Sequence, residues 1–289
     1  MSAAEARLVE RVVDTERYPL SDPEGPAWTD LVARVRNDLH HFGCSVLTDF
    51  VRPSLNETLR REGEAVAPSA HYEVEVVNAY NIAPDTPLPV DHPGRIPMER
   101  GNAFVAWDRI PAEFLVHQLY LSTLLPRFVA ACVGLPTVHP LADPLAGLCL
   151  NVIPPGRAHP WHFDTNEFAV SILTREADSG GVFEYCPDIR SPTDENLADV
   201  RGVLDGRRDD LVTRLTLRPG DLQLFKGRFS LHRVTAVEGA TARHSAIFAY
   251  SERPGVVGNV ERTRQLFGRV LPVHLGVDGR TVRGDHLLD

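Results

Sequence analysis

The stretch Trp161-His162-Phe163-Asp164 decides how the second half of this 289-residue chain is interpreted. Residues two apart in a β-strand point to the same face. His162 and Asp164 are therefore predicted to point together into a barrel, while Trp161 and Phe163 pack on its other side. Two polar groups that can bind a metal would come from one strand.

His232 supplies a third group of the same kind, on a later stretch that follows the turn residues Lys226-Gly227-Arg228. Two imidazoles and one carboxylate on one face of an octahedral metal leave three adjacent positions open, as in oxygen-activating iron(II) sites. Zinc usually takes four ligands. A His-x-Asp pair alone is a weak signal, because such pairs are common at surfaces and turns, but His162, Asp164 and His232 together predict an iron site.

Arg243 and Ser245 follow His232 closely and share one face of the run from Ala242 to Ser251. An arginine that faces a barrel interior needs an anion, and its planar guanidinium fits a carboxylate in bidentate fashion. A dicarboxylate whose other end chelates the metal would satisfy both sites.

Short runs with β character alternate with turns from about residue 148 to residue 251, which predicts a jelly-roll or cupin-like barrel. The predicted strands are Leu148–Pro154, His162–Leu173, Gly181–Cys186, Leu211–Leu217, Asp221–Phe225, Phe229–Val234 and Arg243–Ser251. An insert, residues 188–210, is predicted to carry a short surface helix over Asp194–Leu204.

The first half reads as helical, so the fold class is mainly β with a helical N-terminal part. Helices are predicted over Leu8–Val13, over residues 30–41 with Gly43 as the stop, and over residues 111–133 with a kink or division at Pro126. A strand is predicted over Cys44–Val51, and a capping box of Ser54 and Glu57 is predicted to open a helix that ends at Val66.

These elements predict one catalytic domain. Residues 1–145 would form a helical buttress and pocket loops, residues 146–253 the barrel core, and residues 254–289 a C-terminal extension. The extension either wraps back on the barrel or pairs with another subunit as a homodimer, and the sequence leaves both open.

The overall composition indicates a soluble globular protein whose partner is a small molecule. Lys and Arg total 30 against 39 Asp and Glu, and the net charge of −9 argues against nucleic acid or an anionic membrane as partner. No run approaches the ~20 apolar residues of a membrane helix. Cys44, Cys132, Cys149 and Cys186 form no CxxC pair and residues 1–13 contain no apolar signal segment, which predicts reduced thiols in the cytoplasm.

The set of motifs resembles the iron(II)- and 2-oxoglutarate-dependent dioxygenases over about residues 148–251, with Pro219-Gly220-Asp221 ahead of the distal histidine. The resemblance implies a double-stranded β-helix barrel in which His162, Asp164 and His232 bind Fe(II). It also implies that Arg243 and Ser245 hold the far carboxylate of 2-oxoglutarate and that O2 is the oxidant.

Three segments, residues 151–164, 180–187 and 225–234, resemble a bacterial branch of that superfamily that acts on free amino acids. The branch includes hydroxylases and halogenases, and in the halogenases glycine or alanine replaces the ligand carboxylate. Because Asp164 is present, the resemblance implies oxidation of an unactivated C–H bond of a small, amino-acid-like substrate in biosynthesis, most simply hydroxylation.

Further residues are weaker candidates. By the same resemblance His159 and Asn151 would line the co-substrate or substrate site, although His159 could equally be a solvent-facing histidine at a strand edge. Arg95 and Arg100 could meet a substrate carboxylate, against the alternative of ordinary exposed loop arginines. Trp161 could contact substrate, although a buried tryptophan usually belongs to the core.

Three alternatives remain open from the sequence. The same iron chemistry could give desaturation or ring closure in a biosynthetic pathway. A metal-dependent cupin-type isomerase or hydrolase would use the triad without needing Arg243. A catalytically idle barrel would act only as a binding protein.

Overall fold

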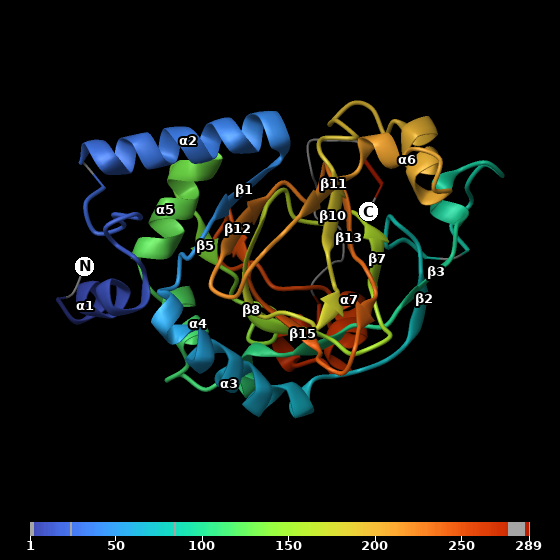
Figure 1. Ribbon diagram of the computed structural model, residues 1–289. Helices are drawn as coiled ribbons and strands as arrows, with labels where there is room; N and C mark the ends of the chain where they lie inside the picture. The colour runs from blue at the N-terminus through green and yellow to red at the C-terminus, as the bar shows by residue number, and fades with distance from the viewer. Residues whose placement is uncertain (1–2, 24, 84, 277–286, 289) are drawn as a thin grey trace.

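Two antiparallel sheets form the centre of the molecule in the computed structural model, which describes residues 3–23, 25–83, 85–276 and 287–288 (Figure 1). The larger sheet runs, in spatial order, β1 (Cys44–Leu47), β12 (Leu222–Phe225), β8 (Ala169–Arg175), β15 (Arg243–Phe248), β6 (Leu148–Ile153) and β4 (Ala103–Val105). The smaller sheet runs β11 (Thr213–Leu215), β10 (Phe183–Cys186), β13 (Leu231–Val234) and β7 (His159–His162). The predicted double-stranded β-helix barrel is confirmed.

Three two-stranded ladders extend this core: β14 (Val237–Glu238) with β9 (Ser179–Gly180), β16 (Tyr250–Ser251) with β5 (His139–Pro140), and β2 (Glu75–Val77) with β3 (Met98–Arg100). The helices are α1 (Ala3–Val12), α2 (Pro26–Phe42), α3 (Asn56–Val66), α4 (Leu115–Tyr120), α5 (Leu124–Val133), α6 (Leu197–Leu204) and α7 (Val260–Phe267). Figure 1 shows α1 to α5 gathered on one side of the barrel and α6 on the opposite side. No described helix is long and apolar enough to cross a membrane.

The N-terminal helices cover the outer face of the larger sheet, which leaves its inner face for polar side chains. Along β15, Ala246 and Phe248 belong to the core cluster that also holds Val35 of α2 and Phe128 of α5. Because side chains alternate along a strand, Arg243 and every second residue after it in β15 point the opposite way, into the barrel. The helical buttress thus fixes which face of the sheet carries the site.

Hydrophobic residues on the outer face of the smaller sheet pack beneath α6. Trp161, Phe163 and Leu231 share a buried cluster with Val200 and Val203 of that helix. The predicted packing of Trp161 and Phe163 away from the barrel interior is therefore confirmed.

Several predicted element boundaries were wrong. The strand predicted over His162–Leu173 is interrupted, because β7 ends at His162 and β8 starts at Ala169. The capping box is absent: Pro53–Leu55 forms a 3-10 turn that takes in Ser54, α3 has no side-chain cap, and Glu57 pairs with Arg60 instead.

The proline in the 111–133 segment neither kinks nor divides a helix. The chain breaks instead at residues 121–123, between α4 and α5, and Pro126 is the third residue of α5. At that position a backbone N–H would have no partner within the helix, so proline costs no hydrogen bond there.

The described part of the C-terminal extension lies on the barrel. The Phe267 ring of α7 meets the Phe104 ring of β4 edge to face, 6.4 Å apart. The buried Asp143 carboxylate accepts a hydrogen bond from Gly258 N at 2.9 Å and lies 3.2 Å from His274 Nε2. Residues 277–286 and 289 of the predicted extension lie outside the described residues, and subunit pairing stays a prediction.

Candidate metal and co-substrate site

The two histidines of the predicted triad lie side by side on neighbouring strands. His162 at the end of β7 is the direct register partner of His232 in β13, and their ring centroids are 4.0 Å apart. The next partners are His159 and Val234, so β7 has one more residue than β13 in this interval. Such a bulge bends a strand and redirects its side chains.

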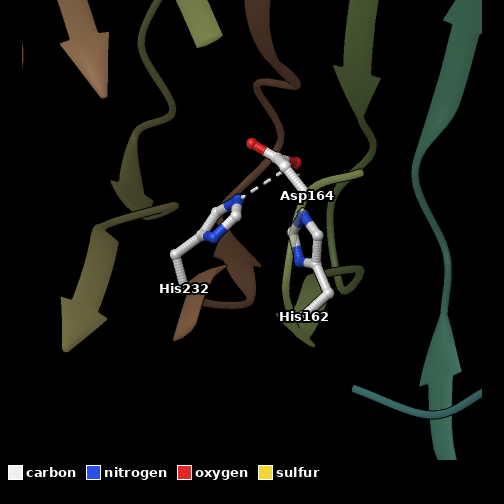
Figure 2. A group of neighbouring side chains, drawn as sticks. All are labelled: His162, Asp164 and His232. Atoms are coloured by element: carbon white, nitrogen blue, oxygen red, sulfur yellow. Dashed lines mark ion pairs between the residues drawn. The ribbon is translucent and has the colours of Figure 1, made fainter. Parts of the chain in front are cut away.

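Asp164 reaches the same point from the loop after β7 rather than from the strand itself. Its backbone N donates to Gly227 O at 3.1 Å. Its Oδ1 lies 3.7 Å from His162 Nε2 and 3.6 Å from His232 Nε2. Figure 2 shows both imidazoles pointing toward the carboxylate. The prediction that one strand presents both His162 and Asp164 is thus wrong, but the predicted cluster forms.

The hydrogen bonds behind the rings fit metal binding. His162 Nδ1 lies 2.8 Å from Pro160 O, and His232 Nδ1 lies 3.0 Å from Ser230 O. Because a carbonyl can only accept, each Nδ1 carries the proton and each Nε2 presents a lone pair, which is the usual outer contact of a metal-binding histidine. One ligand atom from each of the three residues can be chosen so that all lie within 4.8 Å of one another.

The electrostatics favour the protonation states that a metal requires. Burial, with the nearby His159 and His232, lowers the pKa of His162 well below its usual value. Burial would raise the pKa of Asp164, but His232 and His162 outweigh that effect and lower it. The site therefore presents the neutral imidazole of His162 beside the ionised carboxylate of Asp164.

Arg243 is a buried cation on the opposite sheet. Its Nη1 donates to Ser245 Oγ at 2.6 Å, and no described carboxylate forms an ion pair with it. Burial lowers the pKa of Arg243 to about 10, so it remains charged at neutral pH. An unpaired buried guanidinium is costly, and the far carboxylate of 2-oxoglutarate has the charge and shape to neutralise it.

Asn151 lies next to this arginine site. It is the register partner of Ser245 across β6 and β15, and its Oδ1 accepts from Asn102 Nδ2 at 2.9 Å. The sequence interpretation had not included Asn102, whose role depends on a pairing between β4 and β6 that no local pattern signals.

His159 and Arg100 flank the triad on the β7 side. The His159 ring stacks on His162 with centroids 4.0 Å apart. Arg100, at the end of β3, is buried and donates from Nη2 to the Glu75 carboxylate. Burial lowers the pKa of His159 well below its usual value, and Arg100 and Arg262 contribute to the shift. Arg262 belongs to the predicted C-terminal extension, which the sequence interpretation did not connect with the site.

The contacts of Arg95 and Trp161 lie elsewhere. Arg95 is exposed and donates to Leu88 O at 3.2 Å, at the edge of a surface cavity of about 310 Å³. Trp161 is buried in the cluster under α6, with the Arg233 guanidinium 4.6 Å above its ring.

The fold and the triad define an iron(II)- and 2-oxoglutarate-dependent oxygenase, an enzyme whose cofactors are iron and 2-oxoglutarate. A family model described as Halogenase D matches residues 100–265, more than half of the chain. The protein belongs to the Halogenase D family.

Two solved structures share the fold at low sequence identity. AviO1 from Streptomyces viridochromogenes Tue57 is 17% identical, with 78% of this chain and 96% of that chain covered and a TM-score of 0.51. The epimerase SnoN, solved with Fe3+, alpha ketoglutarate and nogalamycin RO, is 12% identical, with 77% and 84% covered and a TM-score of 0.51. No curated protein sequence matches this chain.

Proposed function

We propose that this protein hydroxylates an unactivated C–H bond of a free or modified amino acid, acting as a single catalytic domain. The observation that carries the proposal is the pairing of His162 with His232 across β7 and β13, with Asp164 beside both. Such a triad leaves room on the metal for a chelating co-substrate and dioxygen. Membership of the Halogenase D family supports an amino-acid substrate.

Dioxygen is the oxidant, and iron with 2-oxoglutarate, when bound, would activate it: one of its oxygen atoms enters the C–H bond of the substrate, and the other enters succinate as 2-oxoglutarate loses carbon dioxide. The chain's own part is to position the reactants. His162, Asp164 and His232 hold the metal on one face. Arg243, steadied by Ser245, binds the far carboxylate, and Asn151 lies beside it on the same sheet.

Arg100 and His159 are proposed to contact the substrate, since both lie on the β7 side of the triad, away from Arg243 on the other sheet. Arg100 offers buried donors for a carboxylate, and the pKa shift of His159 favours a neutral ring that can donate or accept a hydrogen bond. The four cysteines are free thiols, which supports a reducing, cytoplasmic setting.

Chloride transfer is the competing outcome, because the family takes its name from a halogenase. A halide would need the metal position that a carboxylate ligand fills. Asp164 is present and its backbone is held by Gly227 O, which favours oxygen insertion. Desaturation and ring closure use the same residues and are distinguished by the product.

The test supplies the protein with iron(II), ascorbate, oxygen, 2-oxoglutarate and a panel of amino acids, and measures succinate release and product mass. A product heavier by one oxygen atom is expected. Replacement of hydrogen by chlorine would assign the protein as a halogenase, and loss of two hydrogens with succinate still formed would assign desaturation or cyclisation.

Two variants exclude the non-oxygenase alternatives. His162→Ala should abolish amino-acid-dependent succinate release if the triad holds the metal. An isomerase or hydrolase would keep its turnover in Arg243→Ala, whereas an oxygenase that binds 2-oxoglutarate there would not. An idle binding barrel predicts no succinate with any amino acid.

A further inference from the structure

Arg100 has hydrogen-bonding capacity that the described chain leaves unused. Its side chain is only 4% exposed, and Nη2 is taken up by the Glu75 carboxylate. Nε and Nη1 are buried and have no hydrogen-bond partner within the described residues. Buried guanidinium donors without acceptors are costly, so the arrangement points to a ligand that supplies acceptors.

Arg262 approaches the same region from the C-terminal helix. Asn259 caps α7 by accepting from Arg262 N at 2.8 Å, and Phe267 fixes the other end of the helix on Phe104 of β4. β4 follows β3, which ends at Arg100, and Gly101 N donates to Ala158 O at 3.3 Å next to β7. α7 is thereby docked along the part of the chain that carries Arg100.

The two arginines lie close enough for their charges to interact, and among the described residues Glu75 is the one acid that forms an ion pair with either of them. The Arg262 charge acts on Arg100, Asp164 and Glu75, yet no described residue forms an ion pair with Arg262, and its Nη1 donates to the neutral Gln265 side chain. Burial, together with Arg100, lowers the pKa of Arg262 to about 10, which still leaves it protonated at neutral pH. Two like charges held close together, one of them with unused buried donors, indicate an anionic ligand.

Charge balance separates this pair from the co-substrate site. In the proposed function, one carboxylate of 2-oxoglutarate lies on the metal and the other on Arg243. Glu75 pairs with Arg100 and Asp164 is assigned to the metal, so Arg262 adds one positive charge that neither the co-substrate nor an ion pair with a described residue takes up. A substrate that carries net negative charge would balance it.

We propose that Arg100 and Arg262 bind two acid groups of one substrate, so that the enzyme acts on an acidic amino acid or a similar dicarboxylate. This inference rests on the proposed function. Glu75, beside Arg100, is placed to accept from the substrate ammonium group. A basic substrate would bring a second cation against Arg262 and is selected against.

The experiment measures substrate binding, not turnover. Calorimetry is carried out without oxygen on protein loaded with iron(II) and 2-oxoglutarate. The probes are L-aspartate, L-glutamate and L-2-aminoadipate, each compared with its side-chain amide, together with L-lysine. At least one dicarboxylate is expected to bind about 10-fold or more tightly than its amide.

The Arg262→Gln variant should lose that preference while keeping the affinity for the amide. Arg264→Gln is the matched control, since Arg264 is an exposed arginine of the same helix, and it should keep the preference. The inference is overturned if no dicarboxylate binds more tightly than its amide, or if Arg262→Gln leaves the ratio unchanged. Succinate release with a neutral or basic amino acid only would overturn it and leave the proposed function standing.

Discussion

Gly227 leaves the space that the Asp164 carboxylate occupies. A β-carbon placed on Gly227 would lie 1.9 Å from Asp164 Oδ2 and 2.6 Å from its Cγ. The Asp164 backbone is held beside Gly227, because its N donates to Gly227 O at 3.1 Å, so the carboxylate could avoid such a β-carbon only by rotating out of its present position. Asp164 can therefore take its place as the third metal ligand only because Gly227, between Lys226 and Arg228, has no side chain.

Gly227→Ala should weaken iron(II) binding by about 10- to 100-fold, the range typical of residues that orient metal ligands. The methyl group forces the carboxylate away from His162 and His232. Anaerobic titration of the metal-free protein with iron(II), followed by calorimetry, measures the effect.

The same substitution in an Asp164→Gly background provides the control. With no carboxylate to displace, Gly227→Ala should change iron affinity by less than about 2-fold. Equal losses in both backgrounds would show that the alanine acts by distorting the loop and not by displacing the ligand.

Arg243→Gln should weaken binding of 2-oxoglutarate by about 100-fold, because a buried charged hydrogen-bond partner is lost. Iron binding should be unchanged, since Arg243 lies on the opposite sheet from both histidines. Calorimetric titration of the iron-loaded variant with 2-oxoglutarate makes the measurement.

Ser245→Ala is the milder comparison, because it removes only the hydroxyl that accepts from Arg243 Nη1. Its effect should be about 10-fold or less. If Arg243→Gln bound 2-oxoglutarate as tightly as the unaltered protein, the assignment of Arg243 to the co-substrate would be wrong.

The sequence predicted the barrel, the triad and Arg243 because each leaves a local trace. Alternating apolar residues mark strands, and the motifs around His162, His232 and Arg243 have characteristic spacing. The prediction failed where local pattern and long-range contact disagree. His162 and Asp164 looked like one strand, but the chain leaves the sheet after His162 and Asp164 is held by Gly227, far along the sequence.

The missed residues are those whose role exists only after folding. The run Ala103–Val105 is too short to signal a strand, yet as β4 it pairs with β6 and brings Asn102 to Asn151. Arg262 lies in an ordinary polar helix, and only the docking of α7 on β4 brings it near the site.

Asp143→Ala should lower the free energy of unfolding by about 3 to 5 kcal/mol, as expected when one partner is removed from a buried network. The carboxylate accepts from Leu145 N, Ala146 N and Gly258 N at 2.8 to 2.9 Å, and His274 lies 3.2 Å away. Chemical denaturation measures the loss.

Asp143→Asn tests how much of the effect comes from the negative charge of the carboxylate and how much from its hydrogen bonds and volume. It keeps one carbonyl acceptor and most of the volume, so its loss should be smaller than that of the alanine variant. A loss under 1 kcal/mol for Asp143→Ala would mean that this cluster does not anchor the segment from Gly258 to His274.

His244 should make the protein less stable as the pH falls from about 6.5 to about 4. Burial, aided by Arg175, lowers the pKa of His244 to about 4 from its usual 6.5. Within that interval the unfolded chain binds a proton that the folded chain does not, so the free energy of unfolding decreases by up to about 3 kcal/mol, and His244 adds no further change below it.

His244→Leu should remove this contribution, so that unfolding curves measured at pH 7 and pH 4.5 lie closer together than those of the unaltered protein. His40→Gln, at an exposed position of α2, is the control for the loss of a histidine that is not buried. Parallel pH profiles for His244→Leu and the unaltered protein would mean that His244 already takes up its proton in the folded chain. In that case the side chain, packed against α3 at Gly63, must reach water more readily than its burial indicates.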